Sequence, residues 1–186
     1  NHSYMYSGHG LDYSIVISNN TITSPQYDGI SISNSSWSYS GTGIFDLTIE
    51  GNTITDAGDS GIDAYPAYAW YSDNVTAQTV LVRGNTVTGS AYDGIDLYLS
   101  DQTSNTLDMQ VTDNILQGNA EDGLELQSTD LGSNGILVAC NVITGNTGDG
   151  IEQGNGDDPP ADYGGGTLGS AGGNVLTGNG GFDFYN

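Results

Sequence analysis

Apolar and polar residues alternate over short stretches of this 186-residue chain, and Gly and Asp interrupt the alternation at regular intervals. The stretch GNTITDAGDSGIDAY at 51–65 shows the plan, with Ile54 and Ile62 flanked by polar residues and a Gly-containing break between them. A period of two predicts β-strands with one buried face, and no segment has the 3.6-residue period of a helix. We therefore predict short strands separated by bends.

The same plan recurs six times, and each copy carries an Asn two residues before an apolar residue. The six asparagines are Asn20, Asn52, Asn85, Asn114, Asn141 and Asn174. Their spacings of 32, 33, 29, 27 and 33 residues are typical of stacked repeats. A second apolar column follows ten residues after each Asn, at Ile30, Ile62, Ile95, Leu124, Ile151 and Phe184. We predict an all-β coil of about six rungs, stacked about 4.8 Å apart.

The Asn column has a structural explanation, because stacked identical amides hydrogen-bond to one another in an in-register stack. We therefore interpret the six asparagines as a structural ladder with no catalytic role. The repeats resemble those of the right-handed parallel β-helix in the pectate-lyase-like superfamily, and GGGTLGSAGGNVLTGN at 164–179 resembles the closing rung of secreted bacterial β-helix repeat proteins. The resemblance implies a right-handed parallel β-helix, with residues 1–186 as one domain. It specifies a fold and leaves the activity open.

Charge narrows the range of partners. The chain has 23 acidic residues and a single Lys or Arg, which gives a formal net charge of -22. Nucleic acids and anionic membrane surfaces are bound mainly through Lys and Arg, and no apolar run approaches the roughly 18 residues of a membrane span. We expect neither a nucleic-acid partner nor membrane insertion. The scarcity of Lys and the abundance of Gly, Asn, Ser and Thr favour an extracellular or cell-surface location.

Two columns of acidic residues follow the asparagines at fixed offsets. The first contains Asp28, Asp93, Asp122 and Asp149, and the second contains Asp63, Asp96, Glu125 and Glu152. Stacked carboxylates repel one another unless solvent or a cation separates them, and Ca²⁺ takes roughly six to eight oxygen ligands. We predict a site for a divalent cation, expected to be Ca²⁺, at Asp28, Asp93, Asp96, Asp122, Glu125, Asp149 and Glu152. The alternatives are a solvated acidic face and Asp side chains that bond the turn backbone ahead of Gly.

Aromatic residues gather between the second apolar column and the next strand in the early repeats. They are Trp37, Tyr39, Tyr65, Tyr68, Trp70, Tyr71 and Tyr98. We predict that these stretches are surface loops lying over one another, and clustered exposed aromatics mark binding surfaces. The patch is therefore predicted to bind sugar rings or another protein. The alternative is a lid that folds back over the coil.

Enzymatic motifs are incomplete. The stretch GHGLD at 8–12 resembles the Gly-His-Gly element of polygalacturonases, but GDD at 156–158 lies far downstream and no Arg-Ile-Lys motif is present. The pectate-lyase resemblance implies an Arg or Lys base beside calcium, for which Arg83 is the only candidate. We expect a non-catalytic protein, with His9 as a turn or edge residue. Polysaccharide cleavage by paired carboxyl groups is the alternative.

Thr-x-Thr pairs flank the first apolar column in three repeats. They are Thr21/Thr23, Thr53/Thr55 and Thr86/Thr88, and they resemble the regular face of ice-binding β-solenoids. The pattern stops in the fourth to sixth repeats, at Ile115/Gln117, Val142/Thr144 and Val175/Thr177. We interpret these threonines as ordinary residues of exposed strands.

Cys140 is the only cysteine, so the chain has no internal disulfide. It stands beside an apolar column, and we predict a small buried hydrophobic side chain there.

The chain begins with the second half of a repeat and stops after the first half of one. A second copy placed after Asn186 would bring its Asn20 32 residues beyond Asn174, within the observed spacings. We therefore expect head-to-tail self-association into a filament, with a fragment of a longer helix as the alternative.

The predicted function is an extracellular structural or adhesive β-helix stabilised by divalent cations. The alternative is a polysaccharide-binding or polysaccharide-cleaving module.

Overall fold

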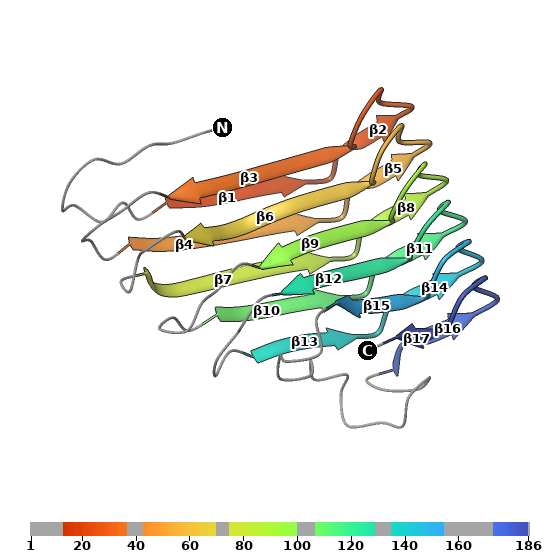
Figure 1. Ribbon diagram of the computed structural model, residues 1–186. Coiled ribbons are helices and arrows are strands. Elements are labelled where there is room, and N and C mark those ends of the chain that lie inside the picture. The colour runs from red at the N-terminus through yellow and green to blue at the C-terminus, as the bar shows by residue number, and fades with distance from the viewer. Residues whose placement is uncertain are drawn as a thin grey trace.

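Each repeat folds into one coil of a parallel β-solenoid whose wall consists of three sheets (Figure 1). The computed structural model describes residues 13–36, 43–69, 75–99, 107–128, 135–154 and 173–185. Within these ranges every pair of neighbouring strands is parallel. The predicted fold class, an all-β parallel solenoid, is confirmed.

Successive strands along the chain belong to sheet A, sheet B and sheet C in that order. Sheet A contains β1 (Tyr13–Ser18), β4 (Gly43–Glu50), β7 (Val75–Arg83), β10 (Leu107–Thr112) and β13 (Gly135–Ala139). Sheet B contains β2 (Thr21–Thr23), β5 (Thr53–Thr55), β8 (Thr86–Thr88), β11 (Ile115–Gln117), β14 (Val142–Thr144) and β16 (Val175–Thr177). Sheet C contains β3 (Ile30–Ser36), β6 (Ile62–Ala69), β9 (Ile95–Leu99), β12 (Leu124–Ser128), β15 (Ile151–Gly154) and β17 (Phe184–Tyr185). Each strand therefore pairs with the equivalent strands of the preceding and following repeats.

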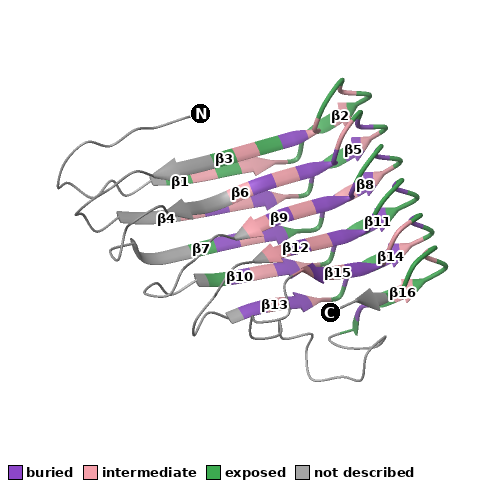
Figure 2. Ribbon diagram, viewed as in Figure 1, coloured by how far each residue is buried: buried purple, intermediate pink, exposed green. Residues whose placement is uncertain are grey.

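The hydrophobic core lies inside the coil, because alternate residues of each strand point inward. In the second repeat the inward side chains are Leu47, Ile49, Ile54, Ile62 and Ala64, and all five are 0% exposed. Figure 2 shows the buried positions alternating with more exposed ones along the strands. Full burial of a Leu or Ile side chain contributes about 1.5–3 kcal/mol, so these stacked apolar layers are the main source of stability.

The strands of sheet B are only three residues long because a left-handed residue bounds each of them on both sides. The corner before the strand is Asn19, Gly51, Gly84, Asp113, Cys140 or Gly173, and the corner after it is Ser24, Asp56, Gly89, Gly118, Gly145 or Gly178. These twelve are all of the described residues with positive φ. Gly adopts this conformation without a steric penalty, and Asn and Asp tolerate it better than most residues.

Cys140 occupies one of these corners and is exposed, so the prediction of a buried side chain is wrong. Its neighbours in the same column, Asp113 and Gly173, are exposed as well. The left-handed corner changes the chain direction and resets the alternation of inward and outward positions. Closeness to an apolar column in the sequence therefore does not imply burial at this position.

The six repeat asparagines form a continuous ladder between sheets A and B. At each step the backbone N–H and the side-chain Nδ2 of one Asn both donate to Oδ1 of the Asn in the next repeat, as from Asn85 to Asn114 at 3.0 Å each. Nδ2 of Asn85 also donates to the Ile49 carbonyl at 2.9 Å. The same bonds join the ladder from Asn20 to Asn174. Buried amides are thus satisfied without water.

A second asparagine ladder, which the sequence analysis missed, lies five residues after the first. It consists of Asn119, Asn146 and Asn179, joined by the same backbone and side-chain bonds at 2.9–3.1 Å. The N–H of Ser90 donates to Oδ1 of Asn119, but Oγ of Ser90 is buried and has no hydrogen-bond partner among the described residues. The signal was available in the sequence as a Gly-Asn dipeptide at this offset in three successive repeats.

Candidate functional site

Four acidic residues form a column on the outward face of sheet C. Asp63 of β6, Asp96 of β9, Glu125 of β12 and Glu152 of β15 are paired neighbours in the strand register. Each follows a buried apolar residue, so the strand alternation turns its carboxyl group outward. Ser31 of β3 continues the column, and its hydroxyl lies 3.4 Å from Oδ2 of Asp63.

A second acidic column lies in the turns that lead into sheet C. Oδ1 of Asp93 accepts the backbone N–H of Asp122 in the next repeat at 2.8 Å. Oδ1 of Asp122 accepts the N–H of Asp149 in the same way, and Asp149 accepts the N–H of Phe182. One oxygen of each carboxyl group therefore joins successive repeats. This is the turn-bonding role that the sequence left open as an alternative, extended from one repeat to the next.

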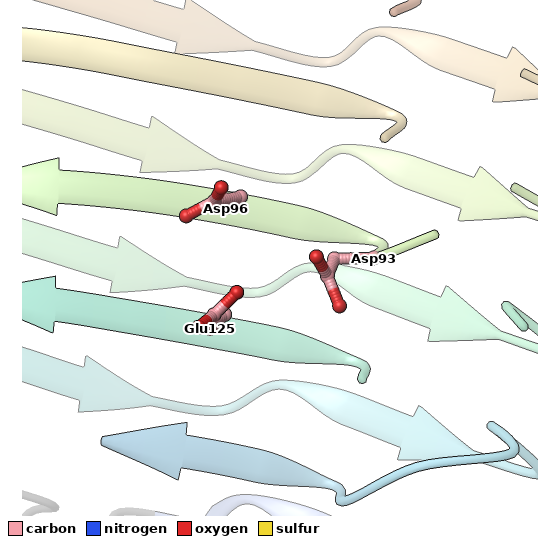
Figure 3. Close-up of side chains that lie close together, drawn as sticks. All are labelled: Asp93, Asp96 and Glu125. Atoms are coloured by element: carbon pink, nitrogen blue, oxygen red, sulfur yellow. The ribbon is translucent and has the colours of Figure 1, made fainter. Parts of the chain in front are cut away.

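Turn acids and strand acids meet in two groups of three, and each group spans two repeats. The first group is Asp93, Asp96 and Glu125 (Figure 3). The second group is Asp122, Asp149 and Glu152. In each group one carboxylate oxygen from every residue lies within 4.8 Å of the others. The structure thus brings together six of the seven predicted metal ligands, whereas Asp28 belongs to neither group.

Burial and mutual repulsion raise the pKa values in the first group. Burial raises the pKa of Asp93 to about 7, and the negative charge of Glu125 adds to this effect. The pKa of Asp96 also rises to about 7, through burial first and the charge of Glu125 second. Burial raises the pKa of Glu125 as well. Near neutral pH this group therefore holds protons that isolated exposed carboxyl groups have lost.

The raised pKa values extend along the column beyond the first group. The pKa of Glu152 rises to about 7, through a hydrogen bond with Asp122 first and burial second. The pKa of Asp63 rises to about 6, through burial first and the charge of Asp28 second. Burial and the charge of Asp59 raise the pKa of Asp28. The acidic residues of five repeats thus form one surface on which neighbouring carboxyl groups repel one another.

The chain's single arginine does not neutralise this surface. Arg83 is paired on sheet A, where its Nε and terminal nitrogen lie 2.9 and 2.7 Å from Oε2 of Glu50. Oδ1 of Asp63 and Oδ1 of Asp96 are buried and have no hydrogen-bond partner within the described part of the chain. A buried carboxylate oxygen without a donor is costly. Oxygen donors of this kind fit a hard divalent cation such as Ca²⁺ or Mg²⁺.

Two of the predicted aromatic ligands lie beside these acids. Tyr65 and Tyr98 stand two residues after Asp63 and Asp96 on the same strands, and therefore on the same face. Their ring centroids are 5.2 Å apart and the ring planes are inclined by 32°. Burial raises the pKa of the Tyr65 hydroxyl, and the charge of Asp63 raises it further.

Not all of the predicted aromatic patch is placed as expected. Tyr65, Tyr68 and Tyr98 belong to strands β6 and β9, although the sequence predicted surface loops. The reason is that the strands of sheet C continue past the second apolar column. Four predicted ligands, together with His9 and the GDD stretch at 156–158, lie outside the described residues. The four are Trp37, Tyr39, Trp70 and Tyr71.

Comparisons with known proteins bear on the fold. The family model described as "Right handed beta helix region" matches residues 4–162. No curated protein and no solved structure matches the chain. Within the described residues no helix is long and apolar enough to cross a membrane. The family match covers most of the sequence and agrees with the three parallel sheets, so this chain belongs to the right-handed β-helix family.

Proposed function

We propose that this protein is an extracellular structural or adhesive β-helix whose acidic face on sheet C binds divalent cations, with Ca²⁺ as the expected ion. The observation that carries the proposal is the presence of two groups of three acidic residues. In each group one carboxylate oxygen from every residue lies within 4.8 Å of the others. Repulsion at this distance is unfavourable unless the groups hold protons or a cation. Above neutral pH the protons are lost, and a bound cation is then what relieves the repulsion between the carboxylates.

The ligands of the proposed site come from two strands and one turn. Asp96 and Glu125 approach from neighbouring strands, and Asp93 approaches from the turn, so one ion would join two repeats. Three side chains provide fewer oxygens than the roughly six to eight that Ca²⁺ takes, and carbonyl groups or water would supply the others. When bound, the ion supplies positive charge that offsets the repulsion and so stabilises the stack.

Calorimetric titration and thermal unfolding test this proposal. We expect Ca²⁺ to bind with release of protons, because the free groups hold protons at pH 7. We also expect a higher melting temperature in Ca²⁺ than in chelator, because the ion binds only the folded arrangement. Asp96→Asn should reduce both effects.

The matched control is Asp108→Asn, which removes an exposed carboxylate from sheet A, away from both groups. It should keep the calcium response of the unmodified chain. Equal melting temperatures in Ca²⁺ and in chelator would contradict the cation proposal, as would equal losses in the two variants.

Head-to-tail self-association is the assembly that fits this structural role. Among the described strands, β2 and β16 are the terminal strands of sheet B, and parallel pairing could continue from either of them. Ile22 and Leu176 near these two ends are only partly buried. Negative-stain electron microscopy with calcium and with chelator is the direct test. Filaments in calcium support the assembly, and single particles in both conditions contradict it.

A second function, polysaccharide binding or cleavage, is favoured by one specific observation. The Tyr65 and Tyr98 rings lie on the same face as Asp96 and Glu125. Aromatic rings stack against sugar rings, and two carboxyl groups roughly 5 Å apart suit a retaining glycosidase. The raised pKa of Asp96 would allow it to donate a proton near neutral pH.

Incubation with neutral and acidic polysaccharides distinguishes the two functions. New reducing ends that disappear in Glu125→Gln would establish cleavage. Binding without cleavage that is lost in Tyr98→Ala would establish a binding module. If the unmodified chain shows neither cleavage nor binding, the second function is contradicted. The cation proposal is unaffected by that result, because it has its own test.

A further inference from the structure

A sequence of the type Asn-x-Thr stands at the first described corner of the coil. Its members are Asn19, Asn20 and Thr21, and the middle residue is not Pro. This is the acceptor sequence for N-linked glycosylation, in which the Asn side chain receives the sugar and the Thr or Ser completes the recognised sequence. Three further Asn-x-Ser/Thr sequences begin at Asn1, Asn34 and Asn74. Asn19 is the one acceptor of the four whose side chain the structure describes.

The two neighbouring asparagines of this sequence have different places in the fold. Asn20 belongs to the first asparagine ladder, where its Nδ2 donates to Oδ1 of Asn52 at 2.9 Å. Asn19 is the left-handed corner before β2, with a φ of 56°, and its side chain takes no part in that ladder. Both Asn19 and Thr21 are exposed. The acceptor and its hydroxyl-bearing partner therefore lie on the outside of the coil, while the ladder holds the residue between them.

The corner column leaves space for a large group on Asn19. The next two corners of the column are Gly51 and Gly84, and both are exposed. A Cβ on Gly51 would lie 2.8 Å from Oδ1 of Asn19, so the missing side chain is what gives Asn19 its place there. Among the described residues, this column thus adds no side chain next to Asn19 for two repeats. A sugar attached to Asn19 would extend outward without entering the core.

The repeat itself does not require this sequence. In the second and third repeats Thr follows the corner at the same distance, but the corner is Gly. In the last three repeats the corner is Asp, Cys or Gly, and an apolar residue stands where the first repeat has Thr. Five repeats thus form the same corner and strand with other residues. Asn19 and Thr21 occur together at these positions only in the first repeat.

We propose that Asn19 is an acceptor site for an N-linked glycan. The transfer forms a bond between Nδ2 of Asn19 and C1 of the first sugar of a lipid-linked oligosaccharide. It breaks the bond between that C1 and the phosphate of the lipid carrier, which leaves, and Nδ2 gives up one proton. The glycan would lie beside β2, the terminal strand of sheet B among the described strands, and would shield its edge from other chains (Figure 1). This assignment rests on the extracellular location in the proposed function.

Secretion of the full chain from yeast cells, behind a signal sequence that is cleaved off, followed by peptide mass spectrometry, tests the proposal. We expect a glycan on Asn19 in the chain without substitutions. Thr21→Val removes the hydroxyl group and should abolish the glycan on Asn19. Val142 and Val175 occupy the same column of sheet B, so the coil accepts valine at this position. Thr21→Ser keeps a hydroxyl group and should keep the glycan.

The matched control is Thr23→Val, which changes the other exposed Thr of β2 and should keep the glycan on Asn19. Circular dichroism of the secreted chains checks that the coil has formed. A folded, secreted chain without a sugar on Asn19 would overturn the proposal, whichever other Asn is glycosylated. A sugar on Asn19 that persists in Thr21→Val would overturn it as well. The calcium response of the same secreted chain is measured separately, so failure of the cation proposal is distinguishable from failure of this one.

Discussion

Glycine occupies the same position in five successive repeats, at Gly29, Gly61, Gly94, Gly123 and Gly150. The reason is space between repeats rather than φ. A Cβ on Gly94 would lie 2.5 Å from the Gly123 carbonyl oxygen and 2.8 Å from Nδ2 of Asn119. The backbone of one repeat thus rests directly on the backbone of the next at this column. No side chain fits between them.

Gly94→Ala should therefore destabilise the fold by about 1–3 kcal/mol, the usual cost of overpacking a tightly packed site. The control is Gly154→Ala, because a Cβ on Gly154 meets no atom of the described residues within 4 Å. Urea unfolding of both variants measures the difference. Equal midpoints for Gly94→Ala and the unmodified chain would show that the repeats can separate locally at little cost.

At Cys140 we predict a substitution that stabilises the fold. Its φ of 59° places a residue with a Cβ in the left-handed region, which costs about 1–2 kcal/mol for most L-residues. Cys140→Gly should raise the free energy of unfolding by about 1 kcal/mol, because glycine removes that cost. Cys140→Ala keeps the Cβ and should give no such gain. A similar gain in both variants would assign the effect to the thiol instead.

Stacking of elements depends on the two asparagine ladders as well as on the core. The first ladder runs through all six repeats, whereas the second begins at Asn119 and leaves Oγ of Ser90 without a partner in the part of the chain that the structure describes. The same position is Ala57 in the second repeat. The first repeats are therefore joined by one ladder and the last repeats by two.

Ser90→Asn should extend the second ladder by one step. Its Nδ2 would donate to Oδ1 of Asn119, as Asn119 does to Asn146 at 2.9 Å. Gly61 faces this position without a Cβ, as Gly94 faces Asn119, so the larger side chain has space. We expect a gain of about 1 kcal/mol, the net contribution of one hydrogen bond. Ser90→Ala is the control, and an Asn variant no more stable than Ala would contradict the extension.

Over the whole molecule, stability depends on how the acidic face titrates. Asp93, Asp96 and Glu152 have pKa values of about 7 in the fold, and Asp63 has about 6. Ordinary Asp and Glu values are about 4 in an unfolded chain. Between about pH 4 and pH 7 the folded chain therefore binds protons that the unfolded chain has lost. Its stability must fall as the pH rises through this range.

Urea unfolding in chelator should accordingly give a lower free energy of unfolding at pH 8 than at pH 5. Asp96→Asn removes one titrating group and should reduce this difference. Addition of Ca²⁺ should reduce it as well if the cation proposal holds. A chain that is more stable at pH 8 than at pH 5 in chelator would contradict the raised pKa values.

Much of the fold was predictable because its repeat is local and regular. The apolar residues after each Asn, such as Ile54 and Ile62, predicted the strands and their inward face. The candidate site was predictable only in part. Fixed offsets identified both acidic columns, but Asp28 and Asp93 have equivalent offsets and only Asp93 joins a group of three. Whether an acidic residue joins a group depends on side chains in the neighbouring repeats. The spacing of residues within one repeat does not give those positions.

The sequence by itself determined the strand periodicity, the stacked repeats, the Asn ladder positions and the excess of acidic residues. Those features follow from local alternation and from repetition at one period. Only the tertiary structure decided that Cys140 is exposed, that Gly94 has no room for a Cβ, and that Tyr65 contacts Tyr98. The left-handed corners and the stacking of one repeat on the next set these contacts, and the stacking joins residues about 30 positions apart in the chain.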